Sequence, residues 1–163
     1  MKCSTCDSTK NLKSVSVTHK YKECGLDNVI LHGVKESRCE DCGEIYLNFG
    51  NVEKLHQLIA VHLIQKSDLL TGKEIRFLRK YLGYSGSVFS KLVGYEVEHL
   101  SRIENGKVTV QETFERLVRA LIIEKMPDRD YNLHDLFLKN KLMKLEWLEF
   151  PLKGKEWRFK KPA

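Results

Sequence analysis

The stretch RCEDCGEIY, residues 38–46, holds two cysteines separated by two residues. A second pair with the same spacing stands at the start of the chain, in CSTC at residues 3–6. Between the pairs lie 32 residues, 7–38. Two such pairs, brought together by the fold, present four sulfurs at the corners of a tetrahedron, as a structural Zn²⁺ site requires. We therefore expect one structural zinc ion per chain, bound by Cys3, Cys6, Cys39 and Cys42.

A redox use of Cys39 and Cys42 is the alternative. A thioredoxin-like motif has one such pair opening a helix within a βαβ pattern, whereas this chain has two pairs and no such pattern. No nucleophile with a general base stands out either, so we expect no enzymatic activity. Cys24 is interpreted as a small, partly buried residue. His19 and His32 are possible competing ligands, but the four cysteines already form a complete set.

Short alternating segments surround the cysteine pairs and predict strands: KSVSVTHKY (13–21), NVILHGV (28–34) and EIYLNF (44–49). Gly43 directly follows Cys42, where the turn of a metal-binding knuckle often needs a positive φ. Lys2 and Arg38, each beside a ligand, would offset the charge of a four-thiolate site. A unit of about 50 residues has a small core, so we expect the metal to supply much of its folding free energy. Residues 1–50 are predicted to form this zinc-binding β domain.

After residue 50 the apolar residues follow a helical spacing. Residues 51–67 are predicted to form a connecting helix, with Asn51 as its N-cap and with His56 and His62 as surface or packing residues. In a following helix, Thr71 and Glu74 form a capping box, and Gly83 ends the helix. Its expected apolar face is Ile75, Leu78 and Leu82.

Two short helices are expected next, at about residues 85–93 and 96–104, with a tight turn at Gly94 between them. Two helices joined by a three-to-four-residue turn with glycine have the helix-turn-helix spacing, in which the second helix lies in the DNA major groove. Residues 68–126 are predicted to form this domain, closed by a helix in TVQETFERLVRALIIEK (109–125) whose exposed remainder would serve as a dimer seam. The residues expected in the core are Val88, Phe89, Leu92, either Val97 or Leu100, Ile103, Phe114, Leu117, Val118, Leu121 and Ile122.

The C-terminal extension, residues 127–163, has no assigned role. Its segment DYNLHDLFLKNKLMKLEWLEF (130–150) is a possible further helix. The tail LKGKEWRFKK (152–161) interleaves basic and aromatic residues, which suits stacking on single-stranded nucleic acid, a capping strand or a dimer arm. We favour the last two interpretations. The apolar residues expected in the additional helix are Leu133, Leu136, Phe137, Leu142 and Leu145.

The net charge of +6 suits a polyanionic partner without establishing one. The excess lies at the C-terminus: residues 107–163 carry thirteen basic and nine acidic side chains, whereas residues 68–106 carry six and five. No apolar run approaches the ~20 residues of a membrane helix, and the N-terminus lacks the apolar core of a secretory signal. We expect a cytoplasmic protein with no membrane association, in which the thiols are kept reduced.

The sequence also resembles a known family. LSRIENGK (100–107), after SVFSKLVGYEVEH (87–99), resembles the end of the recognition helix in the lambda-repressor/Cro-like (XRE) family. With the two cysteine pairs and KECGLDNVILHGV (22–34), residues 1–125 resemble MqsA-type antitoxins, also described as a YgiT-type zinc finger fused to an XRE domain. The resemblance implies a structural zinc domain that can bind a ribonuclease toxin. It also implies a C-terminal domain that dimerises, binds an operator and represses its own operon.

The fold class expected on these grounds is α+β, with a zinc-ribbon-like β domain followed by an all-α, lambda-repressor-like domain. The four cysteines match the family's metal ligands, and Glu98 and Arg102 fall at its base-reading positions. Glu98 replaces an Asn and would accept a hydrogen bond from cytosine N4, and Gly86 replaces a phosphate-contacting Gln. The DNA-binding candidates are Ser85, Ser87, Lys91, Val97, Glu98, His99, Ser101, Arg102 and Lys107.

The resulting hypothesis is a homodimeric repressor that binds a palindromic operator in double-stranded DNA. Besides Lys91 and Lys107, four basic residues could line the DNA backbone: Lys73, Arg76, Arg79 and Lys80. Two alternatives remain open. Arg102 could form an internal salt bridge with Glu98 at i, i+4, and the acidic helix could instead serve a protein-binding adaptor that retains the fold without binding DNA.

Overall fold

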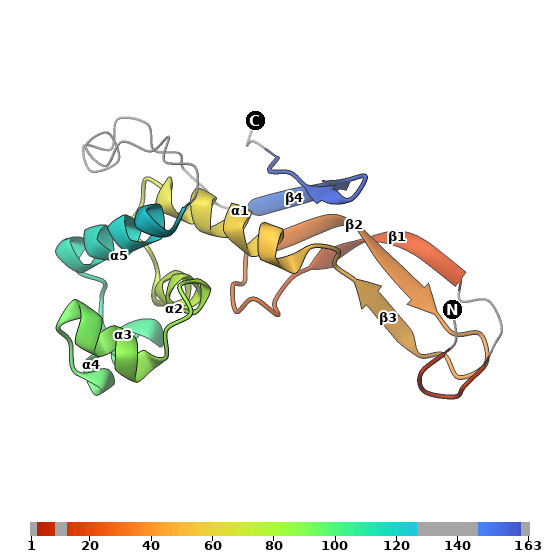
Figure 1. The fold of residues 1–163 in the computed structure, drawn as a ribbon, viewed down its shortest axis with the longest axis horizontal. Coiled ribbons are helices and arrows are strands. Elements are labelled where there is room, and N and C mark those ends of the chain that lie inside the picture. Colours follow the sequence, from red (N-terminus) through yellow and green to blue (C-terminus); the bar gives the residue numbers. More distant parts are fainter. Residues whose placement is uncertain (1–2, 9–12, 127–146, 161–163) are drawn as a thin grey trace.

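The computed structural model describes residues 3–8, 13–126 and 147–160 of the chain. A β-sheet forms one end of the molecule and a group of helices forms the other, with helix α1 between them (Figure 1). The α+β prediction is therefore confirmed. The predicted additional helix with Leu133, Leu136, Phe137, Leu142 and Leu145 lies outside the described residues, although Leu148–Phe150, at the end of the same segment, belong to a strand.

Strand β2 is the centre of the sheet. On one side, strand β1 (Lys13–Lys20) runs antiparallel to β2 (Val29–Arg38), with a bulge between Val17 and Thr18. On the other side, two strands share β2 end to end: β3 is antiparallel to Lys35–Arg38, and β4 is parallel to Val29–His32. The strands are β1 (Lys13–Lys20), β2 (Val29–Arg38), β3 (Ile45–Asn48), β4 (Leu148–Lys153) and β5 (Glu156–Trp157).

The C-terminal hairpin of β4 and β5 therefore completes the sheet that the first fifty residues begin. Leu148, Phe150 and Trp157 are buried, and the Trp157 indole donates to the backbone carbonyl of Phe49 at 2.9 Å. A parallel pair of strands requires a long crossover connection, and here the helices lie within that connection. The strand interpretation of the tail is confirmed, whereas the division of the chain into consecutive segments did not anticipate its place in the N-terminal sheet.

Helix α1 (Val52–Ile64) begins at the predicted N-cap, where the Asn51 side chain accepts from the Lys54 amide at 2.9 Å. The helix packs against both ends of the molecule. His62 contacts Phe150 and Phe159 of the C-terminal segment, while His56 lies against Tyr21 of the sheet end and Phe77 of the helical end. Both histidines are therefore packing residues, and burial lowers the pKa of each.

The remaining helices form the predicted helix-turn-helix unit. Thr71 and Glu74 make the expected capping box, Ser85 caps α3 with its side chain, and Gly94 ends α3 in the left-handed conformation. The Arg79 guanidinium donates to both carboxylate oxygens of buried Glu104, at 2.6 and 2.9 Å, and so joins α2 to α4. The helices are α2 (Gly72–Tyr81), α3 (Gly86–Val93), α4 (Val97–Glu104) and α5 (Glu112–Lys125).

The core prediction is wrong for three residues, and one alternative that it left open is resolved. Val88 and Leu92 are 53% and 49% exposed, because the eight residues of α3 turn only one side inward, with Phe89 and Ser90 fully buried. In α4 the choice between Val97 and Leu100 falls to Leu100, and in α5 Leu117 is exposed. The other core predictions for α2 to α5 are confirmed, with Leu82 and Leu121 partly buried.

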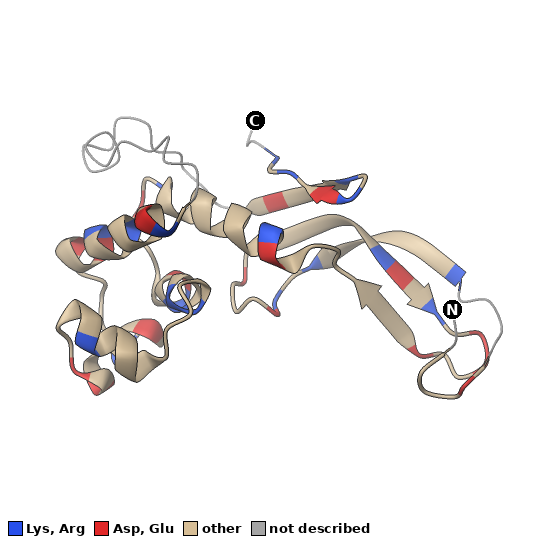
Figure 2. Ribbon diagram, viewed as in Figure 1, with Lys and Arg blue, Asp and Glu red and all other residues tan. Residues whose placement is uncertain are grey.

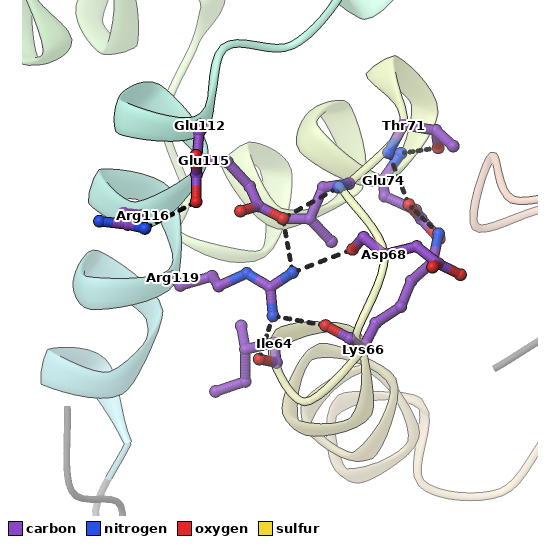
Figure 3. A network of polar contacts seen from close by, with 10 residues as sticks. Ile64, Lys66, Asp68, Thr71, Glu74, Glu112, Glu115, Arg116 and Arg119 are labelled. Carbon is purple, nitrogen blue, oxygen red and sulfur yellow. Dashed lines mark hydrogen bonds and ion pairs between the residues drawn. The ribbon is translucent and has the colours of Figure 1, made fainter. Parts of the chain in front are cut away.

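A buried ion pair holds the segment that joins α1 to α2 (Figure 3). The Arg119 guanidinium donates to the carbonyls of Ile64, Lys66 and Asp68, at 2.5, 2.9 and 3.2 Å. It also donates to the Glu115 carboxylate at 2.5 Å, and that carboxylate accepts from the Leu70 amide at 3.0 Å. The Arg119–Glu115 pair on α5 therefore provides hydrogen-bond partners for four backbone groups of the segment between α1 and α2. Such partners are needed because the carbonyls at a helix end have no intrahelical partner.

We predict that Arg119→Ala lowers the free energy of unfolding by about 3–5 kcal/mol, because it leaves the buried Glu115 carboxylate and the buried carbonyls of Ile64 and Lys66 without this donor. The matched control is Arg116→Ala. Arg116 pairs with Glu112 at the same i, i+4 spacing on the same helix, but both side chains are about half exposed, so a loss of about 0.5 kcal/mol or less is expected. Urea denaturation of both variants measures the difference; equal losses would contradict the assigned role of Arg119.

Candidate metal centre and nucleic-acid interface

The four predicted cysteine ligands meet at one point at the far end of the sheet. Their sulfurs all lie within 4.8 Å of one another, with Cys3 Sγ 3.6 Å from Cys42 Sγ and Cys6 Sγ 3.7 Å from Cys39 Sγ. Four sulfurs at ~2.3 Å from a tetrahedral Zn²⁺ would be ~3.8 Å apart. The donor set and its spacing therefore fit zinc, and all four positions are filled by protein.

The two knuckles have the same backbone geometry. In the first, the Asp7 amide donates to the Cys3 carbonyl at 3.1 Å; in the second, the Gly43 amide donates to the Cys39 carbonyl at 3.0 Å. Asp7 and Gly43 each follow the second cysteine of their pair and have φ of 58° and 76°. The positive φ predicted at Gly43 is confirmed. Asp7 adopts the same left-handed conformation, which aspartate tolerates better than most residues with a side chain.

Tyr46 connects the first knuckle to the strand that follows the second. Its hydroxyl lies 3.2 Å from Cys3 Sγ, 2.9 Å from Ser4 Oγ and 3.1 Å from Thr5 Oγ1. The hydrogen bond from Tyr46, with backbone amides of the knuckle, lowers the pKa of the Cys3 thiol to about 6. Zinc binds the thiolate form, so Tyr46 prepares a ligand for the metal. Sequence reasoning missed this residue, although it ends the quoted stretch 38–46.

The alternative ligands are engaged elsewhere. His19 lies 3.0 Å from Glu23, and His32 contacts Thr18 and Glu149 at 3.2 and 3.1 Å. The Cys24 thiol is half buried and donates to the Tyr21 carbonyl at 3.2 Å. The interpretation of Cys24 as a partly buried residue is confirmed. Of the two basic neighbours of the ligands, Arg38 is exposed, and Lys2 lies outside the described residues.

The second candidate site is the outer side of α4. Val97, Glu98, Ser101 and Arg102 are exposed along it, and Leu100, Ile103 and Glu104 are buried on the opposite side. Among the residues that the structure describes, neither Glu98 nor Arg102 has an ion-pair partner within 4.0 Å, so the internal salt bridge between them does not form. Both charged side chains point from a stably packed helix toward solvent.

The other DNA-binding candidates lie on α3, on α4 and directly after α4. Ser85 and Ser87 lie at the start of α3, with their hydroxyls 3.1 Å apart. Lys91 and Lys107 are exposed, and half-buried His99 packs edge-on against Tyr95 at 4.9 Å. The structure thus brings all nine candidates to the α3–α4 region, and their contact with DNA remains a prediction.

The basic residues of α2 are less available than the sequence suggested. Arg79 is buried against Glu104, and the partly exposed Arg76 also donates to Glu104, at 3.3 Å. Lys73 pairs with Asp27 in the loop between β1 and β2. The expectation that Arg79 lines the DNA backbone is wrong, because its guanidinium is used to join α2 to α4. Figure 2 shows basic and acidic residues mixed along the helices rather than gathered on one of them.

Comparison with known proteins identifies the family. The model of the MqsA family, described as the antitoxin component of a bacterial toxin–antitoxin system, matches residues 1–132. The chain belongs to the MqsA antitoxin family. No curated protein and no solved structure matched it in two further comparisons. The four cysteines are the structural zinc site of this antitoxin, while the β4–β5 hairpin lies beyond the matched residues. No helix in the described part of the antitoxin is long and apolar enough to cross a membrane.

We predict that Tyr46→Phe weakens zinc binding by about 10-fold, as loss of a group that orients and tunes a ligand commonly does. Without the hydrogen bond the pKa of Cys3 rises, so protons compete with zinc at higher pH and the metal is released earlier during acidification. Zinc release against pH, followed with a chromogenic chelator, measures both effects. Tyr84→Phe, an exposed tyrosine of the helical end, is the control; equal release curves for all three proteins would contradict the role of Tyr46.

Proposed function

We propose that this antitoxin is a homodimeric, sequence-specific DNA-binding protein that represses its own operon. The observation that supports the proposal best is the outer side of α4. A helix that ends a helix-turn-helix unit, is fixed from behind by Leu100, Ile103 and Glu104, and presents unpaired charged residues outward has the form of a recognition helix. The family supports the same proposal, because antitoxins of this kind belong to a toxin–antitoxin system.

The electrostatics of one chain support the proposed dimer. Binding to DNA gains most of its non-specific free energy from neutralised phosphates, but Arg79 and Arg76 are engaged by Glu104. Of the described basic residues from α2 to Lys107, those left exposed without an ion-pair partner are Lys80, Lys91, Arg102 and Lys107. Two copies would double the phosphate contacts and read two half-sites about one helical turn apart, which is why we propose a palindromic operator.

We also propose that the cognate toxin is of the ribonuclease type and binds the zinc-containing end of the antitoxin. The family description implies a toxin partner. The sheet extends away from α4, with α1 between them (Figure 1), so that end would stay accessible in a DNA complex. The proposal assigns the chain no catalytic step, since its metal site is closed by four cysteines.

We predict that the zinc-loaded protein binds a fragment from its own upstream region as two chains per duplex, with an affinity that falls steeply with salt. Fluorescence anisotropy and gel shifts measure both properties. Arg102→Ala should lower affinity for the site by about 10-fold and relax base preference at one position of each half-site. Arg158→Ala, which removes an exposed arginine from the C-terminal hairpin, should leave binding unchanged.

Absence of binding to every upstream fragment at low salt would contradict the proposal. Co-purification with a protein partner under those conditions would instead support the adaptor alternative. A small toxin gene next to this one would support the antitoxin assignment independently of any DNA measurement.

A further inference from the structure

Buried side chains are distributed unevenly along the sheet. The first half of β2 pairs with β4, and there Val29, Leu31 and, just beyond the pairing, Val34 are fully buried. The second half, residues 35–38, pairs with β3, and none of its side chains is buried. The apolar core that the sheet shares with α1 is therefore concentrated along the first half of β2.

The end of the sheet that carries the four cysteines, here called the knuckle end (residues 3–8 and 39–46), lacks such a core. Its buried side chains are Cys3 and Cys39, and both are zinc ligands. The polar contacts between the two knuckles lie mostly at the surface, where water competes for each hydrogen bond. Because little apolar area is buried here to offset the entropy of ordering the chain, we expect the knuckle end to depend on the metal for its order.

The β4–β5 hairpin supplies the core of the other half of the sheet. Leu148, Phe150 and Trp157 are buried in one cluster with Leu31 of β2 and with the apolar residues of α1. The Trp157 indole also donates to the Phe49 carbonyl at 2.9 Å, so its buried polar group has a partner. Burial of several large apolar side chains stabilises a fold without any metal.

Polar contacts also fix the position of the hairpin on β2. The Glu149 carboxylate lies 3.1 Å from His32 Nε2 and accepts from Lys160 Nζ at 2.9 Å. The Leu148 amide donates to the Asn28 carbonyl at 2.9 Å, directly before the paired residues of β2. The hairpin is thus bound to the sheet by a defined register as well as by its apolar residues.

We propose that the hairpin and α1 keep the core half of the sheet (residues 21–34 and 148–157) folded without zinc, so that loss of the metal unfolds the knuckle end alone. The two halves are well separated, because Cys39 lies seven residues after His32, the last residue of β2 that pairs with β4. Seven residues of strand span about 23 Å. The expectation that the metal supplies much of the folding free energy then applies to the knuckle end, and not to the whole N-terminal sheet.

A small zinc domain commonly unfolds as a whole without its metal, since the free energy of metal binding is also its free energy of folding. This chain has a second source of stability, because residues beyond the part matched by the family model complete the same sheet. Local unfolding then stops where the apolar core begins. The inference concerns stability and is independent of the proposed DNA and toxin binding.

The experiment is amide hydrogen exchange of the full-length protein, first loaded with zinc and then treated with a strong chelator under reducing conditions. After chelation, peptides that cover the knuckle end should lose their protection. Peptides that cover residues 29–34, β4 and α1 should keep it, because their core contains no metal ligand. Loss of protection throughout residues 13–64 and 148–157 would overturn the inference.

Tryptophan fluorescence gives an independent readout of the hairpin. The chain has two tryptophans, and Trp147→Phe removes the one that is 45% exposed and leaves Trp157, which is 3% exposed. In this variant the emission of Trp157 should remain at the short wavelengths of a buried indole after chelation. A shift to the emission of an exposed indole would contradict the proposal.

A pair of matched variants tests the role of the hairpin itself. Trp157→Ala should make the core half depend on zinc, so that chelation now also removes the protection of residues 29–34. Trp147→Ala, the same substitution at an exposed position of the same segment, should behave as the wild type. If Trp157→Ala fails to fold even with zinc, Trp157→Phe, which removes the hydrogen bond to Phe49, takes its place. A core half that keeps its protection without zinc in the Trp157 variant would overturn the role of the hairpin.

Discussion

Helix α1 is the element on which the rest of the antitoxin depends, because it must bury apolar residues on more than one side. Leu55, Ile59, Ala60, Leu63 and Ile64 are all inaccessible to solvent, and a helix that is apolar over most of its circumference has to be covered on opposite faces. The sheet and its C-terminal hairpin cover one side, and the helix-turn-helix unit covers another, in one continuous core. The zinc site and α4 are thus the two ends of a single packed body.

Two arginines of the helical unit are buried in ion pairs and are therefore unavailable at the surface. Arg119 and Arg79 are both buried, and both are used to join segments of the chain: Arg119 holds the turn after α1, and Arg79 holds α4 through Glu104. Arginines used in this way cannot meet phosphates. Each of these arginines is buried together with a glutamate, so fewer arginines are available to contact phosphates than the composition suggests, and the free residues of α4 become more important for any selectivity toward DNA.

At the other end of the molecule, the metal site depends on residues around its four cysteine ligands as well as on the ligands themselves. The two knuckles repeat the same backbone hydrogen bonds, and the Ser8 hydroxyl donates to Asp41 at 2.5 Å to tie one to the other. The Tyr46 hydroxyl then lowers the pKa of the Cys3 thiol. These groups hold the knuckles in place and lower the pKa of one ligand, so we expect them to affect metal affinity although none of them is a ligand.

The sequence alone determined the features that depend on local chemistry: the ligand set from two C-x2-C pairs, the N-caps at Asn51 and Thr71, and the short helices around Gly94. Such features are encoded within a few residues, where side-chain type and backbone conformation are directly linked. Tertiary structure alone decided what depends on distant partners. Three contacts join residues whose proximity no local pattern records: β4 with β2, Arg79 with Glu104, and Tyr46 with Cys3. The exposure of Val88 and Leu92 likewise could not be predicted locally, because packing of the whole core decides which side of α3 faces inward.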